Sequence, residues 1–93
     1  MTHATSGEAE ERYLAEIRAD CADWLGPGAE LLDLRREATI GGVRLIARIR
    51  FGNRDCESVG VGESMLAAHS ALRAQILFDR IRYGFSAIVQ PRT

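Results

Sequence analysis

The feature that most constrains the fold is a strict alternation of residue types between Val43 and Phe51. Apolar side chains occupy every second position of this stretch, and arginine occupies three of the four positions between them. Successive side chains of a strand point to opposite faces, so the pattern predicts a strand with one buried face. Gly41-Gly42 on one side and residues 52–55 on the other predict tight turns, and therefore an antiparallel meander of three strands.

The turn sequences also predict how the strands are aligned. We expect Gly41-Gly42 to form the first loop and Asn53-Arg54 to lie at the middle of the second loop. The third strand is then expected over residues 56–61. This register places Arg50 between Asp33 and Glu57 on the outer face, where opposite charges pair across strands.

One helix is predicted before the three strands in the sequence, and a second helix is predicted after them. The first starts near Glu8, carries an apolar stripe that includes Leu14, Ile17 and Cys21, and ends at Gly26-Pro27-Gly28. The second extends from Gly62 or Glu63 to Tyr83 and has two apolar stripes. We expect the first stripe to pack on the sheet: Ala67, Ala71, Ala74, Phe78 and Ile81.

The second stripe of this helix lies nearly opposite the first and consists of Met65, Leu72, Ile76 and Tyr83. A helix that covers one sheet needs only one apolar stripe. The second stripe must therefore be covered by the segment 85–89, by the first helix or by another subunit. We take it as the candidate interface for self-association.

These elements predict an α+β fold in the order α-β-β-β-α, with a three-stranded antiparallel sheet and both helices on one face. Ninety-three residues suffice for one domain. We expect residues 1–7 to be a flexible tail and residues 8–93 to be the domain. No apolar run approaches a membrane span, so we expect no membrane partner. Two cysteines are too few for a disulfide scaffold, so we expect a cytoplasmic protein with reduced thiols.

The charges are unevenly distributed along the chain. All twelve basic residues are arginines, which excludes lysine chemistry. Residues 1–34 contain eight acids and two arginines, or −6, whereas residues 35–93 contain five acids and ten arginines, or +5. Such a split either steers a charged partner or draws the two halves together in the fold, and we favour the second interpretation.

Few residues are suited to catalysis. His3 lies in the predicted tail, and His69 lies on the polar side of the second helix with no carboxylate one turn away. Cys21 is on an apolar stripe and is expected in the core, and no nearby charge activates Cys56. We therefore expect no enzyme activity, no metal site and no cofactor.

Two other features are candidates for binding. Gly60, Gly62 and Ser64 form a glycine-rich turn before the second helix, which either holds an anion or effector or simply makes a tight connection. The candidate contacts for nucleic acid are the following basic residues: Arg44, Arg48, Arg50, Arg73 and His69. Acidic residues lie between the strand arginines, which favours a self-neutralised surface.

The element order and the glycine turn resemble the double-stranded RNA-binding domain. That family opens its second helix with G-x-G-x-S-K-K-x-A-K, and Gly60, Gly62, Ser64 and Ala68 match this pattern. The resemblance implies the same fold from about residue 8 to residue 83. The three lysines of the family are replaced by Met65, Leu66 and His69, which removes cations that would contact phosphates.

The strands, glycine turn and alanine-rich helix are also similar to the regulatory domain of isopropylmalate synthase, which implies effector binding. Three hypotheses follow. The leading one is a non-catalytic module that self-associates or binds another protein. The alternatives are binding of nucleic acid through the arginines and binding of a small effector at residues 60–64.

Overall fold

The computed structural model describes residues 6–84, and it contains the following elements: α1 (Ser6–Leu25), β1 (Ala29–Thr39), β2 (Gly42–Phe51), β3 (Arg54–Gly62), α2 (Met65–Asp79) and a short π-helix, η1 (Arg80–Gly84). The predicted α+β fold with the order α-β-β-β-α is confirmed. The predicted tail overlaps α1 at Ser6 and Gly7, and its other residues lie outside the described residues. The C-terminal segment 85–93 also lies outside them.

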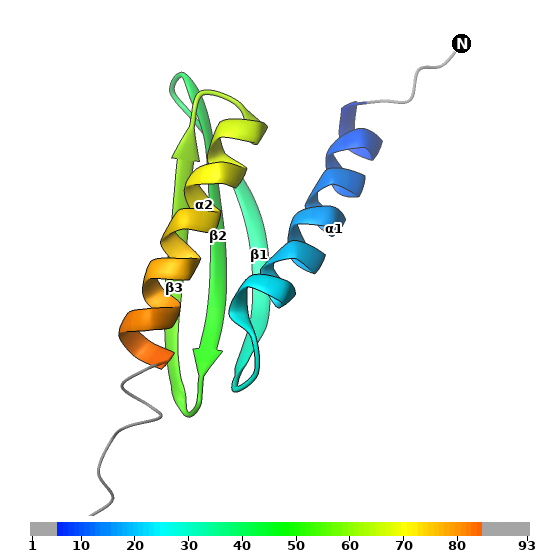
Figure 1. Cartoon of the computed structure of the whole chain (residues 1–93). Helices are drawn as coiled ribbons and strands as arrows, with labels where there is room; N and C mark the ends of the chain where they lie inside the picture. Colours follow the sequence, from blue (N-terminus) through cyan, green and yellow to red (C-terminus); the bar gives the residue numbers. More distant parts are fainter. Residues whose placement is uncertain (1–5, 85–93) are drawn as a thin grey trace, which may run out of the picture.

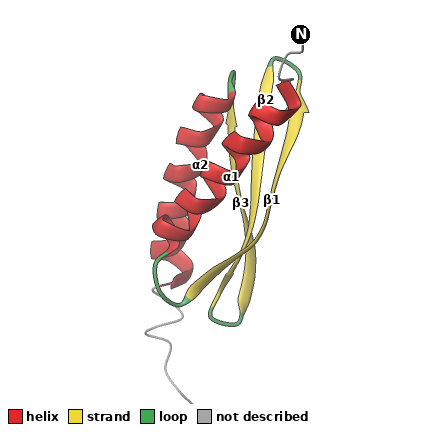
Figure 2. Cartoon of the chain, turned by 90° about the vertical axis from the view of Figure 1, so that its right-hand side faces the viewer, coloured by secondary structure: helices red, strands yellow, loops and turns green. Residues whose placement is uncertain are grey.

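The three strands form one antiparallel sheet in the order β1-β2-β3. Both helices lie on the same face of this sheet, with α1 against β1 and α2 along β3 (Figures 1 and 2). The opposite face carries no element within residues 6–84. None of the helices in this range is long and apolar enough to cross a membrane.

Both hairpins turn one position earlier than predicted. Thr39 pairs with Gly42 and Phe51 pairs with Arg54, so the loops are Ile40-Gly41 and Gly52-Asn53. Gly41 and Gly52 adopt positive φ (83° and 65°), which glycine tolerates and which lets the chain reverse there.

Gly42 belongs to β2 instead, where a Cβ would overlap the carbonyl of Gly62 on the neighbouring strand. The predicted Asp33–Arg50–Glu57 row was therefore wrong. Asp33 and Glu57 both lie opposite Arg48.

A register shift in β1 changes which residues face the core. The shift lies between Leu31 and Asp33, which marks a β-bulge. Leu34 is buried after the bulge, while Ala29 and Leu31 pack against the core before it. The bulge therefore keeps β1 apolar on its inner face although its sequence does not alternate throughout.

The core lies between the sheet and the two helices. Its buried apolar side chains come from α1, β1, β2 and α2: Ile17, Cys21, Leu25, Leu34, Leu45, Ala47, Ile49, Phe51, Ala68, Leu72 and Ile76. The expectation that Cys21 is a core residue is confirmed. Glu10 of α1 and Arg36 of β1 form an ion pair of 3.1 Å beside this core, which joins the acidic and basic parts of the chain.

Candidate association surface

Helix α2 is rotated relative to the prediction. Leu72 and Ile76 are fully buried in the core, and Met65 packs against it. These three residues therefore do not form the predicted interface, because they face the sheet. The fourth, Tyr83, lies in η1, and its side chain is outside the described part of the chain.

Close contact between α2 and β3 explains this rotation. A Cβ on Gly60 would lie 2.5 Å from the carbonyl oxygen of Ala68, and one on Gly62 would lie 2.5 Å from the amide nitrogen of Ala68. The helix backbone can approach β3 only because both positions lack side chains. Leu72 and Ile76 then enter the core between the sheet and the two helices. These large aliphatic side chains bury more apolar surface there than the alanines of the other stripe would.

The stripe predicted to cover the sheet is the exposed one. Phe78 is 56% exposed and Ile81 is 70% exposed, Ala67 and Ala74 are exposed, and Ala71 is half-buried. We call these five residues the outer flank of α2, although the last of them, Ile81, lies in the adjoining η1. They lie on the side of the helix that faces neither the sheet nor α1.

Strand β3 presents an unpaired edge beside this helix. It hydrogen-bonds to β2 on one side, and no other strand within residues 6–84 pairs with its second side. Its nine residues pair with β2 without interruption, and the open face of the strand includes the exposed side chains of Val59 and Val61. Unpaired edges of this kind are templates for pairing with another chain.

A buried polar contact fixes the end of α2 on β3. The Ser58 hydroxyl donates to Asp79 Oδ2 (2.6 Å), and Gln75 Nε2 donates to Asp79 Oδ1 (3.1 Å). Ser58 and Asp79 are both buried. Because Phe78 precedes Asp79, this contact holds Phe78 at the level of Ser58, the middle of β3.

His69 was placed by the sequence on the polar side of the second helix, and in the structure that side faces α1. Nε2 of His69 is 3.2 Å from Asp20 Oδ2, and its Nδ1 is 3.0 Å from the hydroxyl of Tyr13. The ring centroids of Tyr13 and Trp24 each lie 5.5 Å from the ring centroid of His69. No local pattern around His69 indicated this cluster, because the partners of His69 are all on α1.

The cluster joins the two helices through the contacts of His69 with Asp20 and Tyr13. A groove of about 320 Å³ beside it is lined by Asp20, Trp24, Leu66, His69, Ser70 and Arg73. Both ring nitrogens of His69 are already within hydrogen-bond distance of protein groups, so neither points to an unoccupied reaction site. We interpret the cluster as a contact that holds α1 on α2.

The basic residues predicted to contact nucleic acid are divided between two sides of the molecule. Arg44, Arg48 and Arg50 lie on the open face of the sheet, whereas His69 and Arg73 line the groove between the helices. The structure therefore does not bring them into one patch.

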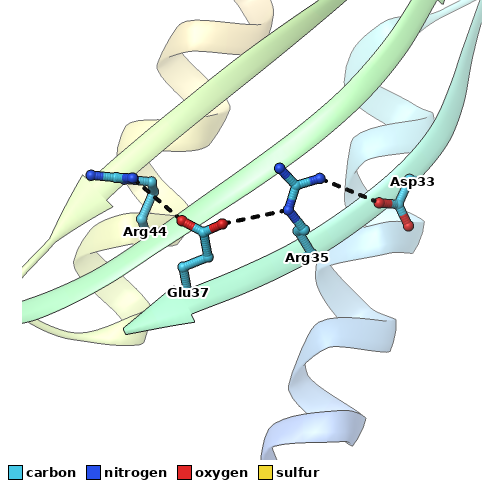
Figure 3. A network of polar contacts seen from close by, with 4 residues as sticks. All are labelled: Asp33, Arg35, Glu37 and Arg44. Carbon is cyan, nitrogen blue, oxygen red and sulfur yellow. Dashed lines mark hydrogen bonds and ion pairs between the residues drawn. The ribbon is translucent and has the colours of Figure 1, made fainter. Parts of the chain in front are cut away.

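Acidic neighbours neutralise much of the open face. Asp33, Arg35, Glu37 and Arg44 form a chain of contacts of 3.9, 3.6 and 3.3 Å (Figure 3). Arg50 Nε donates to Asp55 Oδ1 at 2.8 Å. This bond lowers the pKa of the Asp55 carboxyl and raises the pKa of Arg50.

The glycine-rich turn is occupied by its own chain. The Ser64 hydroxyl accepts a hydrogen bond from the amide of Ala67 (3.1 Å), which caps the start of α2. Gly60 and Gly62 face the helix backbone at close range, so the space that a ligand would need at these glycines is filled by α2. This geometry accounts for the turn without an anion or effector.

The cysteines are shielded to different degrees. Burial, followed by the charge of Asp20, raises the pKa of Cys21 to about 11. Burial also raises the pKa of the half-buried Cys56, with a further contribution from Asp79. Neither thiol is activated as a nucleophile. Among residues 6–84, no three His, Cys, Asp or Glu side chains are grouped so as to hold a metal ion.

Comparison of the chain with protein-family models, with curated proteins and with solved structures gives no match. The two resemblances drawn from the sequence therefore stay predictions.

Proposed function

We propose that this protein is a non-catalytic module that acts by self-association, and that the outer flank of α2 is its contact surface. The observation that carries the proposal is the exposure of Phe78 in α2 and Ile81 in the adjoining η1, because the other apolar face of α2 is already buried. Large apolar side chains gathered on one exposed surface are typical of interaction sites. This surface replaces the one predicted from the sequence.

The composition of the flank supports a helix as the partner element. Ala67, Ala71 and Ala74 precede Phe78 at intervals of four, three and four residues, so small side chains line one side of α2. The distance between packed helices depends on the side chains at the contact, and alanines permit a close approach. Phe78 then supplies the large apolar side chain that gains most from burial.

Catalysis and nucleic-acid binding have less support in the geometry. His69 is held by Asp20 and Tyr13, and the arginines lie on separate surfaces with acidic neighbours. We therefore include neither activity in the proposed function.

Light scattering after size exclusion, together with native mass spectrometry, tests the proposal. We expect a particle of twice 10.2 kDa for the wild type and a monomer for Phe78→Arg. Leu66→Arg is the matched control, because Leu66 is a similarly exposed apolar residue of α2 (68%) that lines the groove toward α1. A wild-type monomer at high micromolar concentration contradicts the proposal, as does equal loss of association in both variants.

A further inference from the structure

We propose that two copies of the chain associate by antiparallel pairing of their β3 strands, which joins the two sheets into one of six strands. The inference rests on the proposed self-association and names the surface on the second copy that completes it. The twofold axis would pass near Ser58, perpendicular to the sheet.

The two edges of the sheet differ in their suitability for pairing. The β1 edge is interrupted by the bulge between Leu31 and Asp33, and Arg18 of α1 donates from Nη2 to the Leu34 carbonyl (3.5 Å). Bulges and covering side chains are established ways of protecting an edge. Strand β3 has neither device in the described structure: its pairing with β2 is regular from Arg54 to Gly62.

The turn before β3 indicates which backbone groups point outward. Gly52, the first residue of a two-residue loop, has positive φ, as in a type II′ turn. The pair next to such a turn, Phe51 and Arg54, exchanges hydrogen bonds, and hydrogen-bonded pairs alternate along an antiparallel ladder. The N–H and C=O groups directed away from β2 therefore belong to Asp55, Glu57, Val59 and Val61.

Charge selects one alignment of the two β3 strands. If Glu57 faced its own copy, two carboxylates would lie opposite each other, and if Val59 faced its own copy, Asp55 would lie opposite Glu63. When Ser58 faces Ser58, Glu57 lies opposite Val59, Asp55 lies opposite Val61, and no acid faces an acid. Because like charges directly opposite are destabilising, the register centred on Ser58 is favoured.

This register also brings the outer flanks together. Ser58 is bonded to Asp79, so a twofold axis near Ser58 passes close to the end of α2 where Phe78 is exposed. The two α2 helices would then lie antiparallel beside each other, with the Phe78 side chains of both copies near the axis. Continuous pairing of β3 and burial of Phe78 thus follow from one arrangement.

Disulfide trapping tests the register. In a Cys56→Ser background that removes the native thiol next to the two test positions, the double variant Glu57→Cys, Val59→Cys should form a covalent dimer on a non-reducing gel after mild oxidation. Each single variant should stay uncrosslinked, because its cysteine faces a residue without a thiol. A covalent dimer from either single variant alone would overturn the Ser58-centred register.

Amide hydrogen exchange of the unmodified protein provides a second readout. The amides of Val59 and Val61 should become protected as protein concentration rises, because pairing engages them. A particle of twice 10.2 kDa in which these amides exchange fast and the double variant does not crosslink refutes β3 pairing but keeps self-association. A particle of 10.2 kDa refutes both proposals.

Discussion

Leu72 and Phe78 show how two apolar residues of one helix take different positions in the molecule. Leu72 is fully buried against the sheet, whereas Phe78 is mostly exposed on the outer flank. Burial of a leucine side chain stabilises a fold by about 1.5–3 kcal/mol. Leu72 is buried when one chain folds, whereas the side chain of Phe78 would be buried only when two chains associate. Leu72 contributes to the free energy of folding of one chain, and Phe78 to association between chains.

Substitutions on the buried face of α2 should unfold the protein. We expect Leu72→Ala to lower the free energy of unfolding by about 3 kcal/mol, and Leu72→Glu or Ile76→Glu to prevent folding, because a carboxylate would be buried without a partner. Urea denaturation followed by circular dichroism measures the effect. A folded, monomeric Leu72→Glu protein would restore the interface first predicted for this stripe.

The two thiols should differ in reactivity. Cys21 is fully buried with a pKa of about 11, whereas Cys56 is only partly shielded. At pH 8 iodoacetamide should label Cys56 first, and Cys21 should react at a comparable rate only in denaturant; peptide mass spectrometry gives both rates. Equal labelling of both thiols in the native protein would contradict the burial of Cys21.

The same shift in pKa predicts a loss of stability at alkaline pH. In the unfolded chain Cys21 ionises near 9.0, and in the folded chain near 11. Above pH 9 the unfolded state has therefore lost a proton that the folded state still holds, so the free energy of unfolding falls as pH rises toward 11. Cys21→Ala should flatten this part of the stability profile, which urea titrations between pH 8 and pH 11 would show.

At the scale of the elements, residue alternation predicted the strands well but not their alignment. Both loops lie one position earlier than expected, which shifts by two residues the register of β3 on β2 and that of β1 on β2 up to the bulge. Beyond the bulge the shift is three residues. A shift of two leaves every side chain on its original face, so the face of Arg44, Arg48 and Arg50 was correct although their partners were not. The register of β1 on β2 places Gly42 inside β2, where only a residue without a side chain fits against Gly62. This contact joins residues that are distant in sequence, so the local turn pattern did not indicate it.

The orientation of α2 was not predictable from its own periodicity, since both stripes are apolar. Small alanines suggested close packing on the sheet, but the small residues that permit it are Gly60 and Gly62 on the strand. For the same reason the glycine turn looked like a ligand site. Its composition is explained by packing, which only the tertiary structure reveals.

Adding one methyl group to β3 should therefore disturb the fit of α2. We expect Gly60→Ala to lower the free energy of unfolding by about 1–3 kcal/mol, because its Cβ would overlap the backbone of α2 near Ala68. Val61→Ala, a change on the open face of the same strand, should shift stability by less than about 0.5 kcal/mol. Chemical denaturation of both variants gives the comparison, and equal effects would argue against the close contact.

At the scale of the whole molecule, α1 makes contacts with the rest of the chain that local sequence patterns do not indicate. The charge asymmetry between residues 1–34 and 35–93 predicted attraction between the two parts, and the Glu10–Arg36 ion pair is an instance of it. His69 was judged by its neighbours along α2, although Asp20 and Tyr13 approach it from α1. Partners contributed by another helix leave no local pattern.

Association would also change how the whole molecule unfolds. A folded dimer in equilibrium with unfolded monomers becomes more stable as protein concentration rises, by mass action. We therefore expect the Tm of the wild type to increase over a hundredfold range of concentration, and the Tm of Phe78→Arg to stay constant. Differential scanning fluorimetry and calorimetry cover this range.

Leu66→Arg serves again as the control, because it adds the same charge to α2 without altering the outer flank. If its Tm rises with concentration as in the wild type, the effect belongs to Phe78 and not to the charge. If the Tm of the wild type is independent of concentration, each chain is stable alone, and the exposed flank does not contribute to its folding.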